Sequence, residues 1–121
     1  MLRRRDQFFI EQQPHLKGGQ GCVELHHILT KQEMLGSGRL FAISILPPGS
    51  TIGYHQHSGE FEVYYILKGK GQLILNGNVI ELNPGDMTCC GDGDSHGLEN
   101  VGEGNLEYIA VILIIPECAA N

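Results

Sequence analysis

Turn residues divide almost the whole chain into short apolar runs, and this spacing restricts the possible folds more than any other feature. Glycine occurs 17 times in 121 residues, about twice its average use. The tripeptide Asn76-Gly77-Asn78, between two apolar runs, is a strong β-hairpin signal. Strands of about 4–10 residues with turns roughly every 8–12 residues are typical of β-sandwiches and β-barrels. We therefore predict an all-β fold.

The chain has the length of one ordinary domain. We expect an N-terminal arm at 1–20, a barrel domain at 21–116 and a C-terminal tail at 117–121. One stretch without strong turn signals, Ile28–Leu35, has room for a helical turn but is too short to change the fold class. The apolar runs predict seven strands, at Cys22–Leu29, Arg39–Leu46, Glu62–Leu67, Gln72–Leu75, Val79–Leu82, Met87–Cys90 and Leu106–Ile115.

The last expected strand, Leu106–Ile115, has apolar side chains on both of its faces from Tyr108 onward. A barrel strand with one face in water should instead alternate apolar and polar residues. Large exposed apolar patches are unusual on monomers. We therefore expect a homodimer whose interface includes the outer face of this strand.

Charge and cysteine content indicate which partners and compartments to expect. The net charge is -6, which disfavours nucleic-acid binding; the basic cluster Arg3–Arg5 is followed by Asp6 and fits a solvated arm. The apolar stretch Phe8–Ile10 is too short for a secretory signal or a membrane span, so we expect no membrane partner. The cysteines form no CxxC pair, which favours free thiols and a cytoplasmic location. They are Cys22, Cys89, Cys90 and Cys118.

Two histidines, His55 and His57, lie in a segment expected to be extended. Side chains alternate along a strand, so both histidines project from one face, about 6.5–7 Å apart, and can reach the same ion. Glu62, at the start of the next expected strand, can add a carboxylate. Two imidazoles and a carboxylate suit a first-row divalent metal. An isolated HxH pair, however, is more often two ordinary surface histidines.

The residues around these histidines resemble both motifs of the cupin family. The first motif, G-x5-H-x-H-x4-E-x6-G, is matched in full by Gly49, His55, His57, Glu62 and Gly69. The second, G-x5-P-x-G-x2-H-x3-N, is matched by Gly85, Gly93, His96 and Asn100. Its proline is replaced by Gly91, which affects the stiffness of the loop before His96 more than the site itself.

Resemblance to cupins implies a double-stranded β-helix, a jelly-roll-like barrel of two antiparallel sheets. It also implies that one divalent transition metal (manganese, iron, nickel or zinc) is bound by His55, His57, Glu62 and His96. Four protein ligands on an ion that accepts six leave two positions for a small-molecule ligand. We predict a metal-dependent enzyme of the dioxygenase, decarboxylase or isomerase type, acting on a small oxygenated acid or enol. The alternative is a non-catalytic binding or sensor protein, since the fold does not select a reaction.

Several other residues near the motifs have weaker claims to a role. Glu60 is a second carboxylate that could replace Glu62 as ligand, although its spacing is two residues short. Tyr64 has the strand parity of Glu62 and should point into the barrel, for core packing or for contact with a ligand. Arg39 is a candidate clamp for a substrate carboxylate, and Tyr54 could present a hydroxyl. Cys89 and Cys90 should face opposite ways. The histidines expected not to be ligands are His15, His26 and His27.

Overall fold

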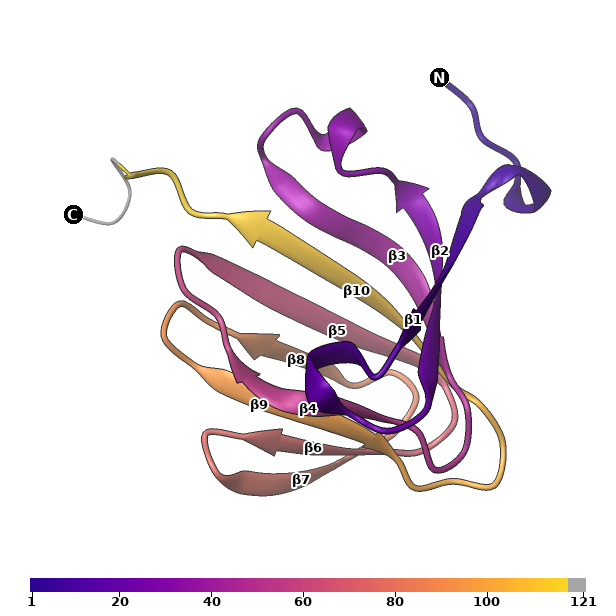
Figure 1. The fold of residues 1–121 in the computed structure, drawn as a ribbon, viewed down its shortest axis with the longest axis vertical. Coiled ribbons are helices and arrows are strands. Elements are labelled where there is room, and N and C mark those ends of the chain that lie inside the picture. The colour runs from indigo at the N-terminus through magenta and orange to yellow at the C-terminus, as the bar shows by residue number, and fades with distance from the viewer. Residues whose placement is uncertain (118–121) are drawn as a thin grey trace.

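Two antiparallel sheets face each other in the computed structural model, which describes residues 1–117 (Figure 1). The chain therefore has the predicted all-β, double-stranded β-helix architecture. The six-stranded sheet contains, in spatial order, β1 (Phe9–Pro14), β2 (Cys22–Leu29), β3 (Gly38–Leu46), β10 (Leu106–Ile114), β5 (Glu60–Lys68) and β8 (Met87–Cys90). The four-stranded sheet contains β4 (Thr51–Gln56), β9 (Ser95–Asn100), β6 (Gly71–Leu75) and β7 (Asn78–Leu82).

The strands expected from the turn signals are all present, with bounds that differ by at most two residues from the prediction. The helical turn expected within Ile28–Leu35 is the 3-10 turn η3 (Gln32–Met34). Two further 3-10 turns are η1 (Arg5–Gln7) and η2 (Leu16–Gly18). Among residues 1–117, no helix combines the length and hydropathy that crossing a membrane requires.

The N-terminal segment connects the two sheets. Part of the expected arm forms β1, which pairs with β2 in the six-stranded sheet. The following turn, η2, lies against β4 of the other sheet, where a Cβ atom on Gly53 would stand 1.9 Å from the Lys17 carbonyl oxygen. Backbone and side-chain hydrogen bonds between Gln20 and Thr51 hold this contact. Only glycine allows such a close approach of two backbones.

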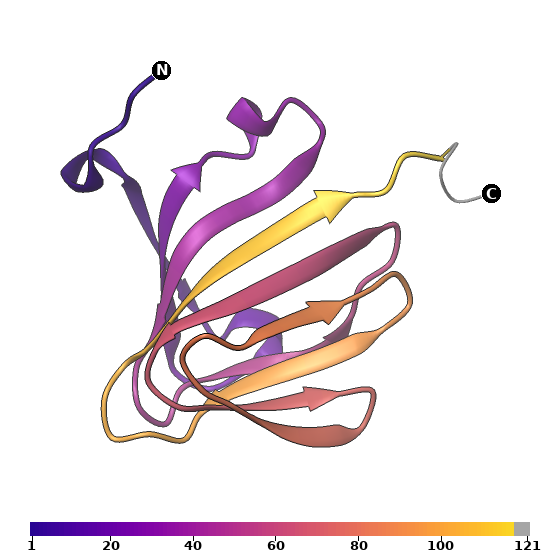
Figure 2. The ribbon, with the colours of Figure 1, turned by 180° about the vertical axis from the view of Figure 1, so that it is seen from behind.

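The core lies between the sheets, where inward side chains of β10 alternate with outward ones. Figure 2 shows β10 side by side with β3 and β5. The buried side chains of β10 are Leu106, Tyr108, Ala110 and Ile112.

The outward side chains of β10 are only half-buried and lie in apolar rows across the sheet. Ile109 pairs with Ile43 and Tyr65, and Val111 pairs with Phe41 and Val63. Tyr65 is 43% exposed. The two-sided apolar character predicted for this strand is thus confirmed, and the homodimer remains a prediction that this face motivates.

Candidate metal centre

Three strands bring together the four residues that the cupin motifs single out. His55 on β4 and His96 on β9 are direct cross-strand partners in the four-stranded sheet. Glu62 lies opposite them on β5, and His57 follows the end of β4. One potential ligand atom from each of the four residues lies within 4.8 Å of the others. His57, Glu62 and His96 are buried, whereas His55 is half-buried.

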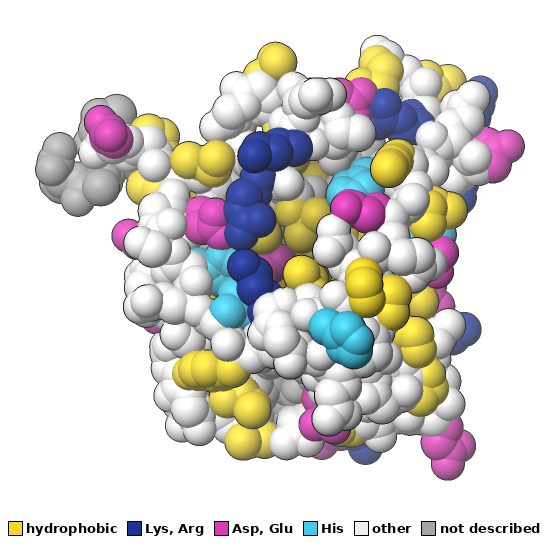
Figure 3. Space-filling model, viewed as in Figure 1, with side chains coloured by type: hydrophobic (Ala, Val, Ile, Leu, Met, Phe, Trp, Pro, Cys, Tyr) yellow, Lys and Arg dark blue, Asp and Glu magenta, His cyan; other side chains and the backbone are white. Residues whose placement is uncertain are grey.

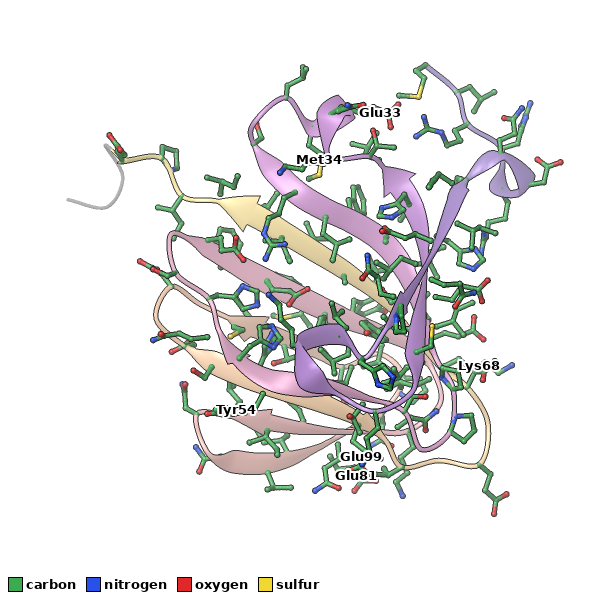
Figure 4. All side chains as sticks on the ribbon, in the orientation of Figure 1. Glu33, Met34, Tyr54, Lys68, Glu81 and Glu99 are labelled. Carbon is green, nitrogen blue, oxygen red and sulfur yellow. The ribbon has the colours of Figure 1, made fainter. Side chains whose placement is uncertain are left out.

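A β-bulge turns His55 into the barrel. Ile52 pairs with Leu98 and His55 pairs with His96, so β4 has one more residue than β9 between these pairs. An extra residue in one strand re-aims the side chains that follow it. Ile52 and His55 are three residues apart, so on a regular strand they would point to opposite faces. Because of the bulge, both point into the barrel: Ile52 is buried and His55 reaches the cluster. Tyr54 between them is 52% exposed and lies away from the site (Figure 4).

The imidazole Nε2 atoms converge on one point together with the Glu62 carboxylate. His57 Nε2 lies 3.2 Å from His55 Nε2 and 3.1 Å from His96 Nε2. Glu62 Oε1 lies 3.1 Å from His57 Nε2 and 3.0 Å from His96 Nε2. Three nitrogens and an oxygen therefore face a common centre, a donor set suited to a divalent transition metal.

The other ring nitrogens show why this arrangement fits a metal. His55 Nδ1 lies 2.6 Å from the Gly53 carbonyl oxygen, and His57 Nδ1 lies 2.5 Å from Glu60 Oε2. Both oxygens accept hydrogen bonds, so each Nδ1 is the protonated atom and each Nε2 of a neutral ring presents a lone pair. Two lone pairs facing each other at 3.2 Å repel unless a cation lies between them. The residues therefore fit a metal ion.

In the metal-free cluster, burial and hydrogen bonding shift the pKa values of the four groups in different directions. Burial lowers the pKa of His55, and the hydrogen bond with Glu62 raises the pKa of His57. Burial alone would raise the pKa of Glu62, but hydrogen bonds with His57 and His96 and the charges of those rings lower it overall. Glu62 is therefore ionised at neutral pH, as coordination requires.

Glu60 lies beside the cluster but on the opposite side of the His57 ring. Its carboxylate accepts the hydrogen bond from His57 Nδ1 and is also held by Arg39, through Nε at 2.7 Å and Nη2 at 2.7 Å. The hydrogen bond with Arg39 is the main reason that the pKa of Glu60 falls to about 2. This position differs from the one expected of a replacement ligand. From this position a carboxylate can fix the orientation of the His57 imidazole.

Tyr64 points into the barrel, as its parity predicts. Its ring is stacked on His96, with centroids 5.0 Å apart and an interplanar angle of 14°, and meets Tyr108 edge-on. Burial, together with the nearby Glu62 charge, keeps the pKa of Tyr64 well above its usual range. The hydroxyl therefore stays protonated at neutral pH.

The cysteines near the site face opposite ways, as predicted. Cys90 is buried and its pKa is raised to about 12, chiefly by burial, whereas Cys89 is exposed. Cys90 is therefore protonated and unreactive at neutral pH. The predicted free thiol at Cys118 lies outside the described residues.

A cavity of about 210 Å³ opens beside the cluster. This is far more than the roughly 10–15 Å³ that one water molecule needs by the same measure, so the cavity has room for a small molecule. Figure 3 shows a hollow with histidine and acidic side chains on both sides and Lys or Arg side chains along one side. The lining includes His55, His57 and Glu62 of the cluster, together with Arg39 and Tyr64, two of the weaker candidates from the sequence.

Five polar residues that were not placed at the site from the sequence also line the cavity. They are Glu11, Gln13, Lys17, His27 and Ser44. One signal could have found His27, because it has the parity of Val23 and Leu25 and these two side chains are buried. His15, His26 and His27 all lie outside the four-residue cluster.

The fold and the site together define a class of protein: a barrel of two antiparallel sheets with three histidines and a glutamate converging inside it. The sequence profile described as "Cupin domain" matches residues 42–112, more than half of the chain. The chain therefore belongs to the cupin family.

Known proteins resemble this chain over half of its length or more. The "Oxalate-binding protein" of Thermotoga maritima is 43% identical over 115 residues, which cover 95% of each chain. A crystal structure of a predicted oxalate decarboxylase from Thermotoga maritima, also 43% identical, superposes with a TM-score of 0.89 over 95% of this chain and 100% of that one. Quercetin 2,3-dioxygenase of Bacillus subtilis is 33% identical over 64 residues, which cover 53% of this chain and 19% of that enzyme.

Proposed function

We propose that His55, His57, Glu62 and His96 bind one divalent transition metal ion, and that this metal binds a small carboxylate in the adjoining cavity. The observation that supports the metal most strongly is the convergence of three Nε2 atoms and Glu62 Oε1 within hydrogen-bonding distances of one another. Manganese, iron, nickel and zinc all accept this combination of imidazole and carboxylate ligands.

The charge of the site favours an anionic ligand. A divalent ion with one carboxylate and three neutral imidazoles has a net charge of +1. The cavity is also lined by Lys17, by Arg39, which is paired with Glu60, and by the carboxylate of Glu11. A six-coordinate ion would keep two positions for the ligand. Oxalate, with two neighbouring carboxylate oxygens, suits such a pair of positions, and the 43%-identical relative is named for binding it. Oxalate is therefore the first ligand to test.

Residues of the chain have separate tasks in this proposal. Glu60 holds His57 in the orientation that directs Nε2 at the ion, and the Gly53 carbonyl does the same for His55. The buried rings of Tyr64 and Tyr108 exclude water from the inner wall of the cavity. Arg39 places its guanidinium at the cavity wall, fixed there by Glu60. When bound, the metal supplies Lewis-acid activation of the ligand oxygens.

Turnover of the bound acid is the second candidate function. The TM-score of 0.89 to a predicted oxalate decarboxylase favours it, and the cavity supplies Arg39 and Tyr64 as candidate catalytic residues. Fold similarity alone does not determine a reaction.

One titration experiment tests binding and turnover together. Metal-free protein is loaded separately with manganese, iron(II), nickel and zinc, and oxalate binding is followed by calorimetry, with elemental analysis afterwards to show that oxalate has not removed the metal. We expect saturable binding to at least one loaded form and none to the metal-free form. Equal binding to both forms, or to neither, would contradict the proposal. Release of formate, carbon dioxide or an oxidised product during long incubation would show that the loaded protein is also an enzyme.

A further inference from the structure

The cavity has a second polar end, formed by the first two strands. Glu11 on β1 accepts a hydrogen bond from Gln13 Nε2 at 2.6 Å, and its other carboxylate oxygen lies 2.8 Å from His27 Nε2 on β2. The side chain of His27 is 14% exposed. All three residues line the same cavity as the metal cluster. None of them lies within residues 42–112, the part of the chain that the cupin profile matches.

Strand register places this pair at the far end of the cavity from the cluster. His27 pairs with Ala42, Ala42 with Ala110, and Ala110 with Tyr64, so these four residues form one row across the six-stranded sheet. Three steps of roughly 4.8 Å separate the outer two Cα atoms by about 14 Å. Tyr64 is stacked on His96 of the cluster. Of the two alanines between Tyr64 and His27, Ala110 lines the cavity and Ala42 is fully buried.

A polar pair at this position is unusual for a barrel interior. The other inward side chains of β2, Val23 and Leu25, are buried and apolar. Moving polar groups out of water costs free energy unless hydrogen bonds compensate it, and a leucine at position 27 would continue the apolar row. The hydrogen bonds among Glu11, Gln13 and His27 offset part of that cost, and the Glu11 side chain remains 38% exposed. Its accessible carboxylate can therefore accept a hydrogen bond from a ligand at this end of the cavity.

The chemistry of the pair indicates which group it accepts. His27 Nε2 is engaged by Glu11, and a carboxylate accepts hydrogen bonds only, so Nε2 carries a proton; in the neutral ring, Nδ1 then presents a lone pair. Glu11 has further lone pairs beyond those used by Gln13 and His27. Both residues thus offer acceptors, and the negative charge of Glu11 repels a second carboxylate. A hydrogen-bond donor, such as a hydroxyl or an ammonium group, satisfies this end.

We propose that Glu11 and His27 form a subsite for a hydrogen-bond-donating group at the far end of a carboxylate ligand whose acid group lies at the metal. This inference rests on the proposed function and narrows its ligand class to short carboxylates with a distal hydroxyl or ammonium group. Oxalate occupies only the metal end, because it has no such group.

The test uses metal-loaded protein and a matched series of ligands. Affinities are measured for ω-hydroxy and ω-amino carboxylates of two to six carbons, and for unsubstituted monocarboxylates of equal length. At one chain length the distal donor should raise the affinity about tenfold or more. The hydroxyl and amino series identify which donor the subsite prefers.

Variants locate the gain in affinity. His27→Ala should remove it and Glu11→Gln should reduce it, while metal content shows that both variants remain folded. His26→Ala is the matched control, because its side chain lies on the opposite face of β2. The inference is overturned if no chain length shows a gain, or if the gain persists in His27→Ala. Loss of the proposed function is a separate result, in which the wild-type protein binds no metal or no carboxylate, oxalate included.

Discussion

Replacing Asn100 by alanine should destabilise the fold without removing a metal ligand. The Asn100 side chain is 2% exposed. Its Nδ2 donates to the carbonyl oxygens of Leu46 at 2.8 Å and Gly104 at 2.9 Å, and its Oδ1 accepts from the Gly102 N–H at 2.8 Å. Asn100 thus ties the end of β3 to the loop that leads into β10. Asn100, the last residue of the second cupin motif, is therefore expected to stabilise the fold rather than to bind the metal.

The expected magnitude follows from the three hydrogen bonds. Each neutral hydrogen bond contributes about 1 kcal/mol net, so Asn100→Ala should lower the free energy of unfolding by about 3 kcal/mol. The buried Leu46 carbonyl oxygen loses its partner, which places the effect at this value or above. For a chain of this length, about 3 kcal/mol corresponds to a fall of roughly 10–15 °C in the midpoint of thermal unfolding.

Urea unfolding in the presence of a chelator measures this loss without a contribution from metal binding. Asn78→Ala is the control, because Asn78 is exposed, and its change should stay within about 0.5 kcal/mol. At low temperature the folded Asn100→Ala protein should still bind metal. A loss below about 1 kcal/mol for Asn100→Ala, or an equal loss for Asn78→Ala, would refute the structural task given to Asn100.

Three further predictions concern the metal, its pH dependence and assembly. Glu60→Gln should weaken metal binding roughly 10–100-fold, because it removes the carboxylate that orients His57. Glu81→Gln, on the exposed surface, should leave metal binding unchanged. Competition with a chromogenic chelator measures the affinity of both variants. Metal affinity should fall with decreasing pH, because protons compete with the metal for the imidazoles. The pKa of His57 is raised, so protonation of His57 begins above the ordinary value of 6.5, whereas the pKa of His55 is lowered, so His55 is protonated only below that value. A metal affinity that stays constant in titrations at stepped pH values would contradict this prediction. Sedimentation should give about twice the chain mass of 13.3 kDa for the wild type and the single-chain mass for Val111→Lys, and a wild-type mass near 13.3 kDa would exclude the dimer.

The sequence predicts most strands because their turns are marked by glycine, proline and asparagine, and their inward faces are apolar. β9 and β1 were missed for a physical reason, and β4 was expected only as an extended segment around His55 and His57. The inward residues of β9 include His96 and Asn100, and the cavity-lining residues of β1 are Glu11 and Gln13. Polar side chains on the inward face remove the alternation by which a strand is recognised. Strands with polar inward side chains are thus the hardest to find from pattern alone.

The candidate ligands were predictable because the cupin motifs fix the spacing of His55, His57, Glu62 and His96. Their surroundings were not. The hydrogen bond from His57 to Glu60 depends on the turn between β4 and β5, and the inward direction of His55 depends on the bulge in β4. Neither feature has a local sequence signal that fixes its geometry.

Metal content per chain tests the central claim most directly. Wild-type protein, His57→Ala and His26→Ala are exposed to manganese, iron(II), nickel or zinc, dialysed, and analysed for metal by mass spectrometry. His57 contacts every other member of the cluster through Nε2, whereas His26 lies outside it. We predict one equivalent of metal in the wild type and in His26→Ala, and none in His57→Ala. Equal metal content in all three proteins, or no metal in the wild type under any of these conditions, would contradict the assignment of the site.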